Sequence, residues 1–278
     1  MRVSIHAITG HMAAVKTCKA MAKGIEKCGD KVVIRSVADT NVSSFDAVVL
    51  WGFIEPCQQI IRNCQNLGIP WVFIDLGYFR REKGYYKVTV NDRHPDKYLM
   101  VLPHPKKRFE KLGLTIKPWR INPSGSILIA GMSGKAAWSW GLQPEEYERA
   151  VIQELQTRYP DFPIIYRPKP TWSGASLIPG TKFDKFQPLK HLWSKLWCVV
   201  SHHSNVCCEA LIEGIPVFCQ YGAASVLGPH DLTKIRSPEY PDNREQWAAN
   251  LAYCQWSLTE MEEGVVWSYL KEVGLIRV

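Results

Sequence analysis

Three short polar segments follow apolar stretches in the second half of the chain, and each could contact an anionic ligand. The first is AGMSGK, residues 130–135. Gly131 and Gly134 let the backbone approach a ligand closely, free N–H groups there can surround phosphate oxygens, and Lys135 adds a positive charge. The spacing matches neither the Walker loop nor the dinucleotide fingerprint. A plain glycine turn between a strand and a helix is the alternative interpretation.

The second segment is YRPKP, residues 166–170. Proline after Arg167 favours an extended backbone, so Arg167 and Lys169 are expected to project from the end of a strand. Two cations at the carboxyl edge of a sheet make an anion site. An exposed basic turn is the alternative.

The third segment is SHHSNVCCE, which precedes another apolar stretch. Ser204 or Asn205 can cap the helix that follows, so that its first N–H groups favour a phosphate. Glu209 lies about one turn inside that helix, within reach of a ribose hydroxyl. His202 and His203 could contact a base, a phosphate or only the neighbouring strand.

The elements that must position these segments alternate between strands and helices. Short apolar strands separated by helices predict parallel sheets covered on both faces, with ligands beyond the carboxyl ends of the strands. We therefore predict an α/β protein with two Rossmann-like, doubly wound parallel-sheet domains facing a cleft. The expected strands of the first half are residues 3–6, 31–37, 45–52 and 70–75. In the second half, strands are expected within the segments 126–135, 163–170, 197–205 and 216–219.

A basic stretch with several prolines marks the expected domain boundary. It follows a tyrosine-rich, strand-like segment at residues 84–92. We expect one domain over residues 1–120 and a second over residues 121–278. Two helical patterns finish the chain, and the last helix could pack back on the first domain.

Composition narrows the class of protein and partner. A chain of 278 residues with 46% hydrophobic content is long enough for two domains. The formal charge of +8 suggests an anionic partner such as nucleotide phosphates, nucleic acid or an acidic glycan. No apolar run approaches the ~20 residues needed to cross a bilayer and no signal peptide is evident, so we expect a soluble, cytoplasmic protein. Nine cysteines without a C-x-x-C pair fit a reducing compartment and predict no metal site.

Two of the segments also resemble a known family. HHSNVCCEALIEGIPVFC resembles the signature of GT-B glycosyltransferases, in which a strand, a small polar loop and a helix with an interior glutamate hold the nucleotide-sugar donor. YRPKP is similar to the R/K-P-x-P element of capsule-polysaccharide and sialic-acid-type transferases, with Lys169 where those enzymes usually have histidine. That difference leaves the nucleotide open. DLGYFRREKGYYKVTVND and YPDNREQWAANLAYCQWSLTEMEEG are similar to segments of small phage-encoded transferase-like proteins.

The resemblance implies a nucleotide sugar as co-substrate and no separate cofactor. It makes residues 121–278 the donor-binding domain and residues 1–120 the acceptor side. The chain contains no D-x-D sequence, so the metal-dependent mode of the other large transferase fold is not supported. By resemblance, the donor pyrophosphate would face Gly131, Ser133 and Lys135, the nucleotide or phosphate would contact Arg167 and Lys169, and Ser204, Asn205 and Glu209 would fix phosphate and ribose.

A transfer that inverts the sugar also needs a base to deprotonate the attacking hydroxyl. Asp75 is expected at the tip of the fourth strand, His11 after the first strand and Glu55 after the third. We favour Asp75, because DLGYFRR combines a strand-end carboxylate with aromatic residues and two arginines. A loop-capping aspartate is the alternative for Asp75, and for His11 the alternative is a residue that only begins the following helix.

These features favour a metal-independent glycosyltransferase that moves a sugar from a nucleotide donor to a hydroxyl acceptor. The acceptor could be a hydroxymethylated base in phage DNA, extruded from the duplex, or a glycan such as a capsule polysaccharide. A catalytically inactive module that binds nucleotides or nucleic acid, and an epimerase, remain alternatives.

Overall fold

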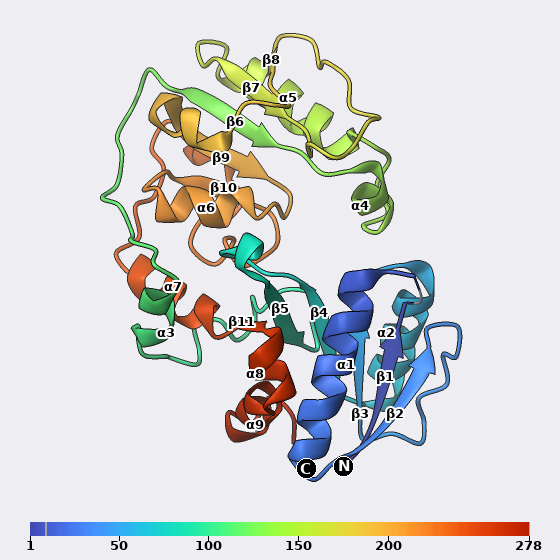
Figure 1. The fold of residues 1–278 in the computed structure, drawn as a ribbon. Helices are drawn as coiled ribbons and strands as arrows, with labels where there is room; N and C mark the ends of the chain where they lie inside the picture. Colours follow the sequence, from blue (N-terminus) through green and yellow to red (C-terminus); the bar gives the residue numbers. More distant parts are fainter. Residues whose placement is uncertain (9, 278) are drawn as a thin grey trace. The chain divides into compact units, whose positions relative to one another are not determined.

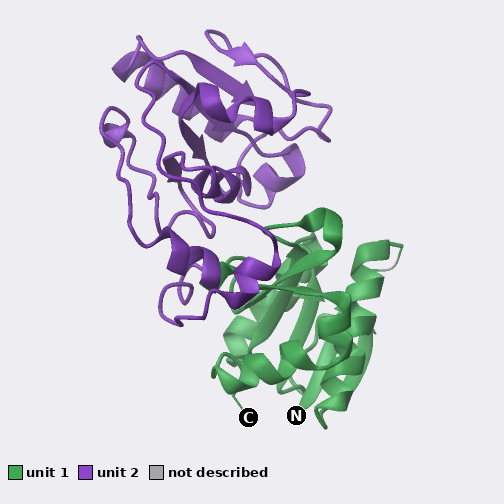
Figure 2. Ribbon diagram, turned by 60° about the vertical axis from the view of Figure 1, so that its left-hand side comes forward, with its two compact units in different colours: residues 1–95, 250–278 green, residues 96–249 purple. Residues whose placement is uncertain are grey.

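The computed structural model describes residues 1–8 and 10–277, and the chain divides into two compact units (Figure 2). Unit 1 comprises Met1–Pro95 with Asn250–Val278, and unit 2 comprises Asp96–Ala249. Residues 96–120, which we expected in the first domain, therefore belong to unit 2, and the chain returns to unit 1 at Asn250.

Unit 1 is built on a six-stranded sheet, called sheet A, with the strand order β11-β5-β4-β3-β1-β2 (Figure 1). β1 to β4 run parallel, as the alternation of apolar strands and helices predicts. β5 and β11 are antiparallel to their neighbours, because β4 and β5 are joined by a short turn with no crossover helix. The strands are β1 (Arg2–Ala7), β2 (Lys31–Ser36), β3 (Ala47–Trp51), β4 (Trp71–Leu76), β5 (Tyr85–Val90) and β11 (Gln255–Ser257).

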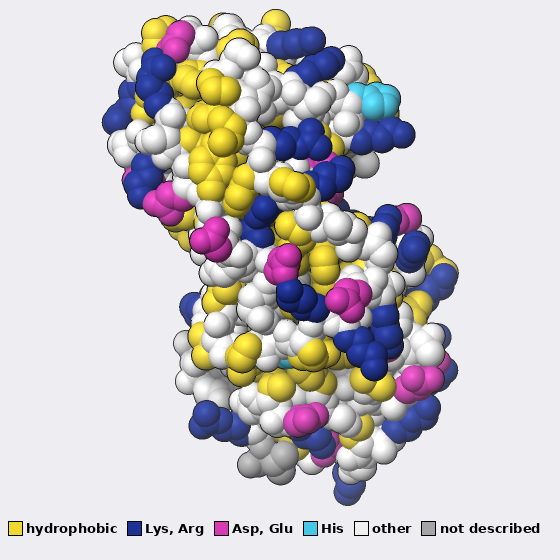
Figure 3. Space-filling model, turned by 90° about the vertical axis from the view of Figure 1, so that its left-hand side faces the viewer, with side chains coloured by type: hydrophobic (Ala, Val, Ile, Leu, Met, Phe, Trp, Pro, Cys, Tyr) yellow, Lys and Arg dark blue, Asp and Glu magenta, His cyan; other side chains and the backbone are white. Residues whose placement is uncertain are grey.

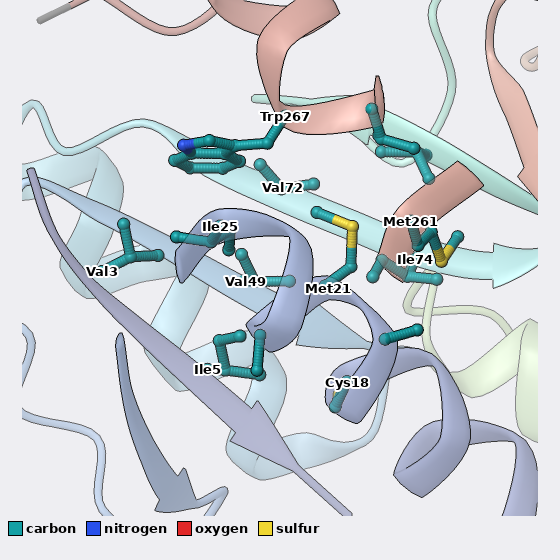
Figure 4. Close-up of a cluster of buried hydrophobic side chains, with 14 of the residues drawn as sticks. Val3, Ile5, Cys18, Met21, Ile25, Val49, Val72, Ile74, Met261 and Trp267 are labelled. Atoms are coloured by element: carbon teal, nitrogen blue, oxygen red, sulfur yellow. The ribbon is translucent and has the colours of Figure 1, made fainter. Parts of the chain in front are cut away.

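Helices cover both faces of sheet A. On one face, α1 (Met12–Lys27) packs with α8 (Leu258–Glu262) and α9 (Val265–Glu272). Figure 4 shows Met21 of α1 beside Val72 and Ile74 of β4, with Met261 of α8 close by. On the other face lies α2 (Glu55–Leu67), which has proline in its first turn and ends at Gly68 in the left-handed conformation. The C-terminal helices therefore complete the core that begins at the N-terminus.

Unit 2 is built on a five-stranded parallel sheet, called sheet B, with the strand order β10-β9-β6-β7-β8. Its core lies between the strands and α5 (Glu146–Arg158). α6 (Val206–Ile212) packs on β9 and β10. The strands are β6 (Ser126–Ala130), β7 (Ile164–Arg167), β8 (Lys182–Phe183), β9 (Leu196–Ser201) and β10 (Val217–Cys219).

Short elements connect these layers. They are α3 (Lys107–Lys111), α4 (Gly134–Trp138), α7 (Arg244–Ala252) and the 3₁₀ turns Arg81–Lys83, Leu189–His191, Trp193–Lys195 and Leu232–Lys234. Within the described residues, every helix is too short or too polar to cross a membrane.

Candidate functional site

The candidate site lies at the carboxyl edge of sheet B, where the strand order changes direction between β6 and β9. Ligands of doubly wound sheets bind at such points. The Ser201 hydroxyl donates to the Ala130 carbonyl at 2.8 Å, and the Ser204 N–H donates to the Ser201 hydroxyl at 3.0 Å. The loop after β6 and the loop after β9, both predicted to bind anions, are therefore held side by side.

The loop after β6 leaves several backbone donors without a partner. The Gly131 N–H donates to the Arg167 carbonyl at 2.9 Å, and the Ser133 hydroxyl accepts from the Ala136 N–H at 3.3 Å. Within the described part of the chain, the N–H groups of residues 133, 134 and 135 find no hydrogen-bond acceptor. Consecutive free N–H groups of this kind suit an anion, and Lys135 beside them is exposed.

Neighbouring side chains pack closely against the two glycines of this loop. A Cβ at Gly131 would lie 2.9 Å from Tyr166 Cε2 and 3.1 Å from Glu148 Oε1. A Cβ at Gly134 would lie 3.3 Å from the Pro144 ring. We expected glycine here for the approach of a ligand. The structure shows that close packing against the protein already disfavours a larger residue at Gly131, whereas at Gly134 the Pro144 ring would need to shift by only a few tenths of an ångström.

Two buried glutamates lie at the start of α5, and sequence reasoning missed both. Glu148 Oε1 accepts the Met132 N–H at 2.7 Å, and burial raises the pKa of this carboxyl. Burial also acts to raise the pKa of Glu145, but hydrogen bonds from Ser176 and Arg149 outweigh it and lower that pKa. Glu148 follows the apolar periodicity of α5, so a charged residue on the buried face was the available signal.

Arg167 lies at the end of β7, as predicted, but it is already paired. Its guanidinium contacts the Asp184 carboxylate at 3.2 Å, and the side chains are only 10% and 6% exposed. Lys169 lies two residues beyond and is exposed. The basic segment therefore provides one structural cation and one cation that faces solvent.

The loop after β9 differs in detail from the prediction. The Ser204 hydroxyl accepts the Val206 N–H at 3.3 Å, whereas the Asn205 side chain makes no capping hydrogen bond and the residue is itself helical. Glu209 is exposed on the first turn of α6. Ser204 is therefore the capping residue of the pair.

His202 and His203 contact each other through their Nδ1 atoms at 2.8 Å. One Nδ1 must carry a proton and the other must lack it, since two N–H groups cannot point at one another. His202 is buried, and His203 is partly exposed. The doublet thus combines a core residue with one at the rim of the site.

Asp75 lies at the carboxyl end of β4 in unit 1 and is partly buried. It pairs in register with Lys87 of the neighbouring strand β5, and its Oδ1 accepts the N–H of the next residue at 2.8 Å. Burial lowers the pKa of Arg93 to about 10, while the charges of Asp92 and Asp75 act to raise it. The carboxylate therefore belongs to a charged cluster at the edge of sheet A.

His11 caps α1, where its Nδ1 accepts the Ala14 N–H at 3.2 Å, and its ring lies 5.7 Å from the ring of Trp51. In the neutral ring the proton is then on Nε2, so this nitrogen is a donor and not an acceptor. Trp51 belongs to the core beneath α1, whereas Asp75 shares the opposite face of the sheet with Phe73. The two candidate bases therefore belong to opposite faces of this edge.

Glu55, the third candidate base, begins α2 and is exposed, and its carboxylate pairs with Arg62 at 3.1 Å. Among the described residues, no three histidine, cysteine, aspartate or glutamate side chains gather as a metal site would require.

Comparison of the sequence with protein-family models and with curated proteins finds no match. Solved structures do match. The beta Kdo 2,7 transferase KpsC of Thermosulfurimonas dismutans is 12% identical with a TM-score of 0.54, and the match covers 97% of this chain and 100% of that one. The beta Kdo 2,4 transferase KpsC of the same organism is 14% identical with a TM-score of 0.50, covering 88% and 89%. The chain has the GT-B fold.

The GT-B fold confirms the prediction of two Rossmann-like units, each with parallel strands. In this GT-B chain, the loops brought together at sheet B carry Gly131, Ser133, Lys135, Ser204 and their neighbours. Sequence reasoning missed residues that hold or border these loops. They are Glu145, Glu148, Asp184, Ser201 and Tyr221.

Proposed function

We propose that this protein is a glycosyltransferase that binds a nucleotide-sugar donor at the carboxyl edge of sheet B. The observation that carries the proposal is the junction of the loops after β6 and β9, tied by the Ser201 hydroxyl to the Ala130 carbonyl. Three consecutive N–H groups that have no acceptor among residues 1–8 and 10–277, together with the exposed Lys135, make this junction suited to the donor phosphates. The exposed Lys169 and Glu209 are the further candidates for contact with the nucleotide and its ribose.

The chemistry we propose moves the sugar in one step. The acceptor hydroxyl oxygen attacks the anomeric carbon, the bond from that carbon to the phosphate oxygen breaks, and the electron pair remains on the phosphate. The Asp75 carboxylate takes the hydroxyl proton. Asp75 is preferred to His11 as the base, because the Nδ1 of His11 is occupied by the Ala14 N–H and its Nε2 then carries a proton.

The test is calorimetric titration with nucleotides and nucleotide sugars that carry uracil, cytosine, guanine or adenine. Lys135→Ala should weaken binding of the matching nucleotide about tenfold, as the loss of one charge-assisted contact does. Lys195→Ala is the matched control, because Lys195 is an exposed lysine just before β9, at the opposite edge of the same sheet. If no member of the panel binds the wild-type protein, the proposal is wrong.

For the acceptor we propose a glycan. On the face drawn in Figure 3, lysine and arginine side chains form separate groups with acidic side chains between them. On this face the cations therefore do not form the single patch by which a protein usually follows DNA phosphates.

A hydroxymethylated base in DNA is the competing acceptor, and the formal charge of +8 is the observation that favours it. Duplex binding that falls steeply with added salt would favour DNA. Release of free sugar from the donor by the purified protein distinguishes a transferase from an inactive nucleotide-binding module.

A further inference from the structure

An aromatic cluster borders the candidate phosphate loop, and the proposed function does not use it. It consists of Trp140, His203 and Tyr221, and we call it the aromatic platform. The rings of Trp140 and Tyr221 are stacked, with centroids 4.8 Å apart and planes 16° apart. The His203 ring lies 5.4 Å from the Trp140 ring.

The platform belongs to the same edge of sheet B as the phosphate loop. Trp140 follows α4: the Ser139 N–H donates to the Lys135 carbonyl at 3.2 Å, and the Trp140 N–H donates to the Ala137 carbonyl at 2.9 Å. His203 directly precedes Ser204 in the loop after β9. The Tyr221 N–H donates to the His202 carbonyl at 2.7 Å, which ties the segment after β10 to that loop. Three adjacent strands, β6, β9 and β10, thus each contribute one ring.

Core packing explains the floor of the platform but not its outer surface. His202 is buried and meets the Tyr147 ring edge-on at 5.1 Å. Tyr221 above it is 42% exposed, and Trp140 and His203 are partly exposed. Large apolar rings left open beside a polar loop are typical of ligand surfaces.

We propose that the aromatic platform binds the sugar ring of the donor. This inference rests on the proposed function. In a nucleotide sugar, the sugar is bonded directly to the terminal phosphate, whereas the base is separated from the phosphates by the ribose. A platform one helical turn from the candidate phosphate loop is therefore placed for the sugar. The stacked rings leave no slot between them for a base, and the exposed part of the Tyr221 ring suits the C–H face of a pyranose.

The polar atoms at the rim of the platform fit the same ligand. The Tyr221 hydroxyl can exchange hydrogen bonds with sugar hydroxyls at the border of the stacked face, whereas the Nδ1 of His203 already contacts the Nδ1 of His202. A pyranose held in this way would contact both an apolar surface and polar groups around it.

The experiment compares two affinities in each variant. Isothermal titration gives the dissociation constants of UDP and UDP-glucose, of GDP and GDP-mannose, and of CMP and CMP-N-acetylneuraminate, for the pair that binds the wild-type protein. Tyr221→Ala and Trp140→Leu should weaken binding of the nucleotide sugar about 5- to 10-fold and change binding of the nucleotide alone less than about twofold. Tyr221→Phe should retain most of the stacking and should weaken binding of the nucleotide sugar less than Tyr221→Ala does.

Phe186→Ala is the control, because this side chain is 83% exposed in unit 2 but outside the platform. It should leave the ratio of the two dissociation constants unchanged. Equal weakening of nucleotide and nucleotide sugar by Tyr221→Ala would show that the platform holds the base, and would overturn the inference alone. If neither these six compounds nor the adenine members of the calorimetric panel bind the wild-type protein, the proposed function and the inference are overturned together.

Discussion

The carboxyl edges of sheets A and B are built in different ways. In sheet B, the loops after β6 and β9 support one another directly, through the Ser201 hydroxyl and the Ala130 carbonyl. In sheet A, the loop after β4 is held by Gln255 from the far end of the chain. Its Oε1 accepts the N–H groups of Tyr78 and Phe79, both at 2.8 Å.

This difference explains why one edge is easier to read from sequence than the other. The sheet B loops hold short polar segments whose composition indicates anion binding. The sheet A edge collects single residues, such as Asp75 and His11, whose surroundings come from distant segments. The segments of the proposed donor site can therefore be recognised locally, whereas the surroundings of the proposed base depend on the assembly of the whole of unit 1.

The largest expected effect separates the two edges by function. Asp75→Asn should lower kcat by about 10²- to 10⁴-fold, since it removes the proposed general base. Donor affinity should stay unchanged, because the donor is proposed to bind sheet B. His11→Gln is the comparison variant and should lower kcat less than Asp75→Asn does. A tenfold loss of donor affinity in Asp75→Asn, measured by titration, would contradict this division of roles.

The next effect concerns stability of unit 2. Arg167→Ala should lower the free energy of unfolding by about 3 kcal/mol, because the buried Asp184 carboxylate would lose its cation. Adding Asp184→Asn should restore part of that loss. Urea denaturation of the single and double variants measures both values. If the Arg167→Ala variant is as stable as the wild type, Arg167 does not stabilise the fold through Asp184 and would again be a candidate for ligand binding.

The two units should also respond to pH with opposite signs. Burial, together with the nearby Arg35 charge, lowers the pKa of His6 in β1 from 6.5 to about 4, although a hydrogen bond to the Ser36 carbonyl opposes the change. Neutral His6 therefore contributes up to about 3 kcal/mol to unit 1 above pH ~6.5, and this contribution is lost as the pH falls towards 4.

In unit 2, Glu148 should change the free energy of unfolding with pH in the opposite direction. Burial raises the pKa of Glu148 in the folded state. Its contribution to the free energy of unfolding is therefore present at low pH and is lost as the pH rises through the folded-state pKa. Urea midpoints followed across pH, with His6→Asn and Glu148→Gln as the matched variants, measure both slopes. His6→Asn should reduce only the loss of stability at low pH, and Glu148→Gln should reduce only the loss of stability at high pH. Identical pH profiles for a variant and the wild type would remove that residue from the explanation.

The smallest effect tests the clamp on the sheet A edge. Gln255→Leu should lower the free energy of unfolding by about 2 kcal/mol, because the buried N–H groups of Tyr78 and Phe79 would lose their acceptor. Hydrogen exchange measured by mass spectrometry should show faster exchange in residues 77–84. Gln246→Leu is the control, since the Gln246 amide instead donates to the His104 carbonyl in unit 2. Unchanged exchange at residues 77–84 would mean that the loop is held by other contacts.

Much of the fold could be predicted from hydrophobic periodicity, and some of it could not. The stretches around Ile5, Val49 and Ile129 are strands with helices between them, as expected. The antiparallel pairing of β5 and β11 was not foreseen, because periodicity identifies a strand but not its direction. The pairing of Trp256 with Tyr86 joins residues that are 170 positions apart, which no local pattern indicates.

The amino-acid sequence by itself determined which segments are polar, where the chain turns and which cations are available. Glycine, proline and charge act over a few residues, so AGMSGK, YRPKP and SHHSN were recognisable as strand-end segments. Only the tertiary structure decided which groups remain open to a ligand. It paired Arg167 with Asp184, placed Glu148 beneath the Met132 N–H and stacked Trp140 on Tyr221. Such choices depend on burial and on contacts between distant segments, and these exist only after the sheets have formed.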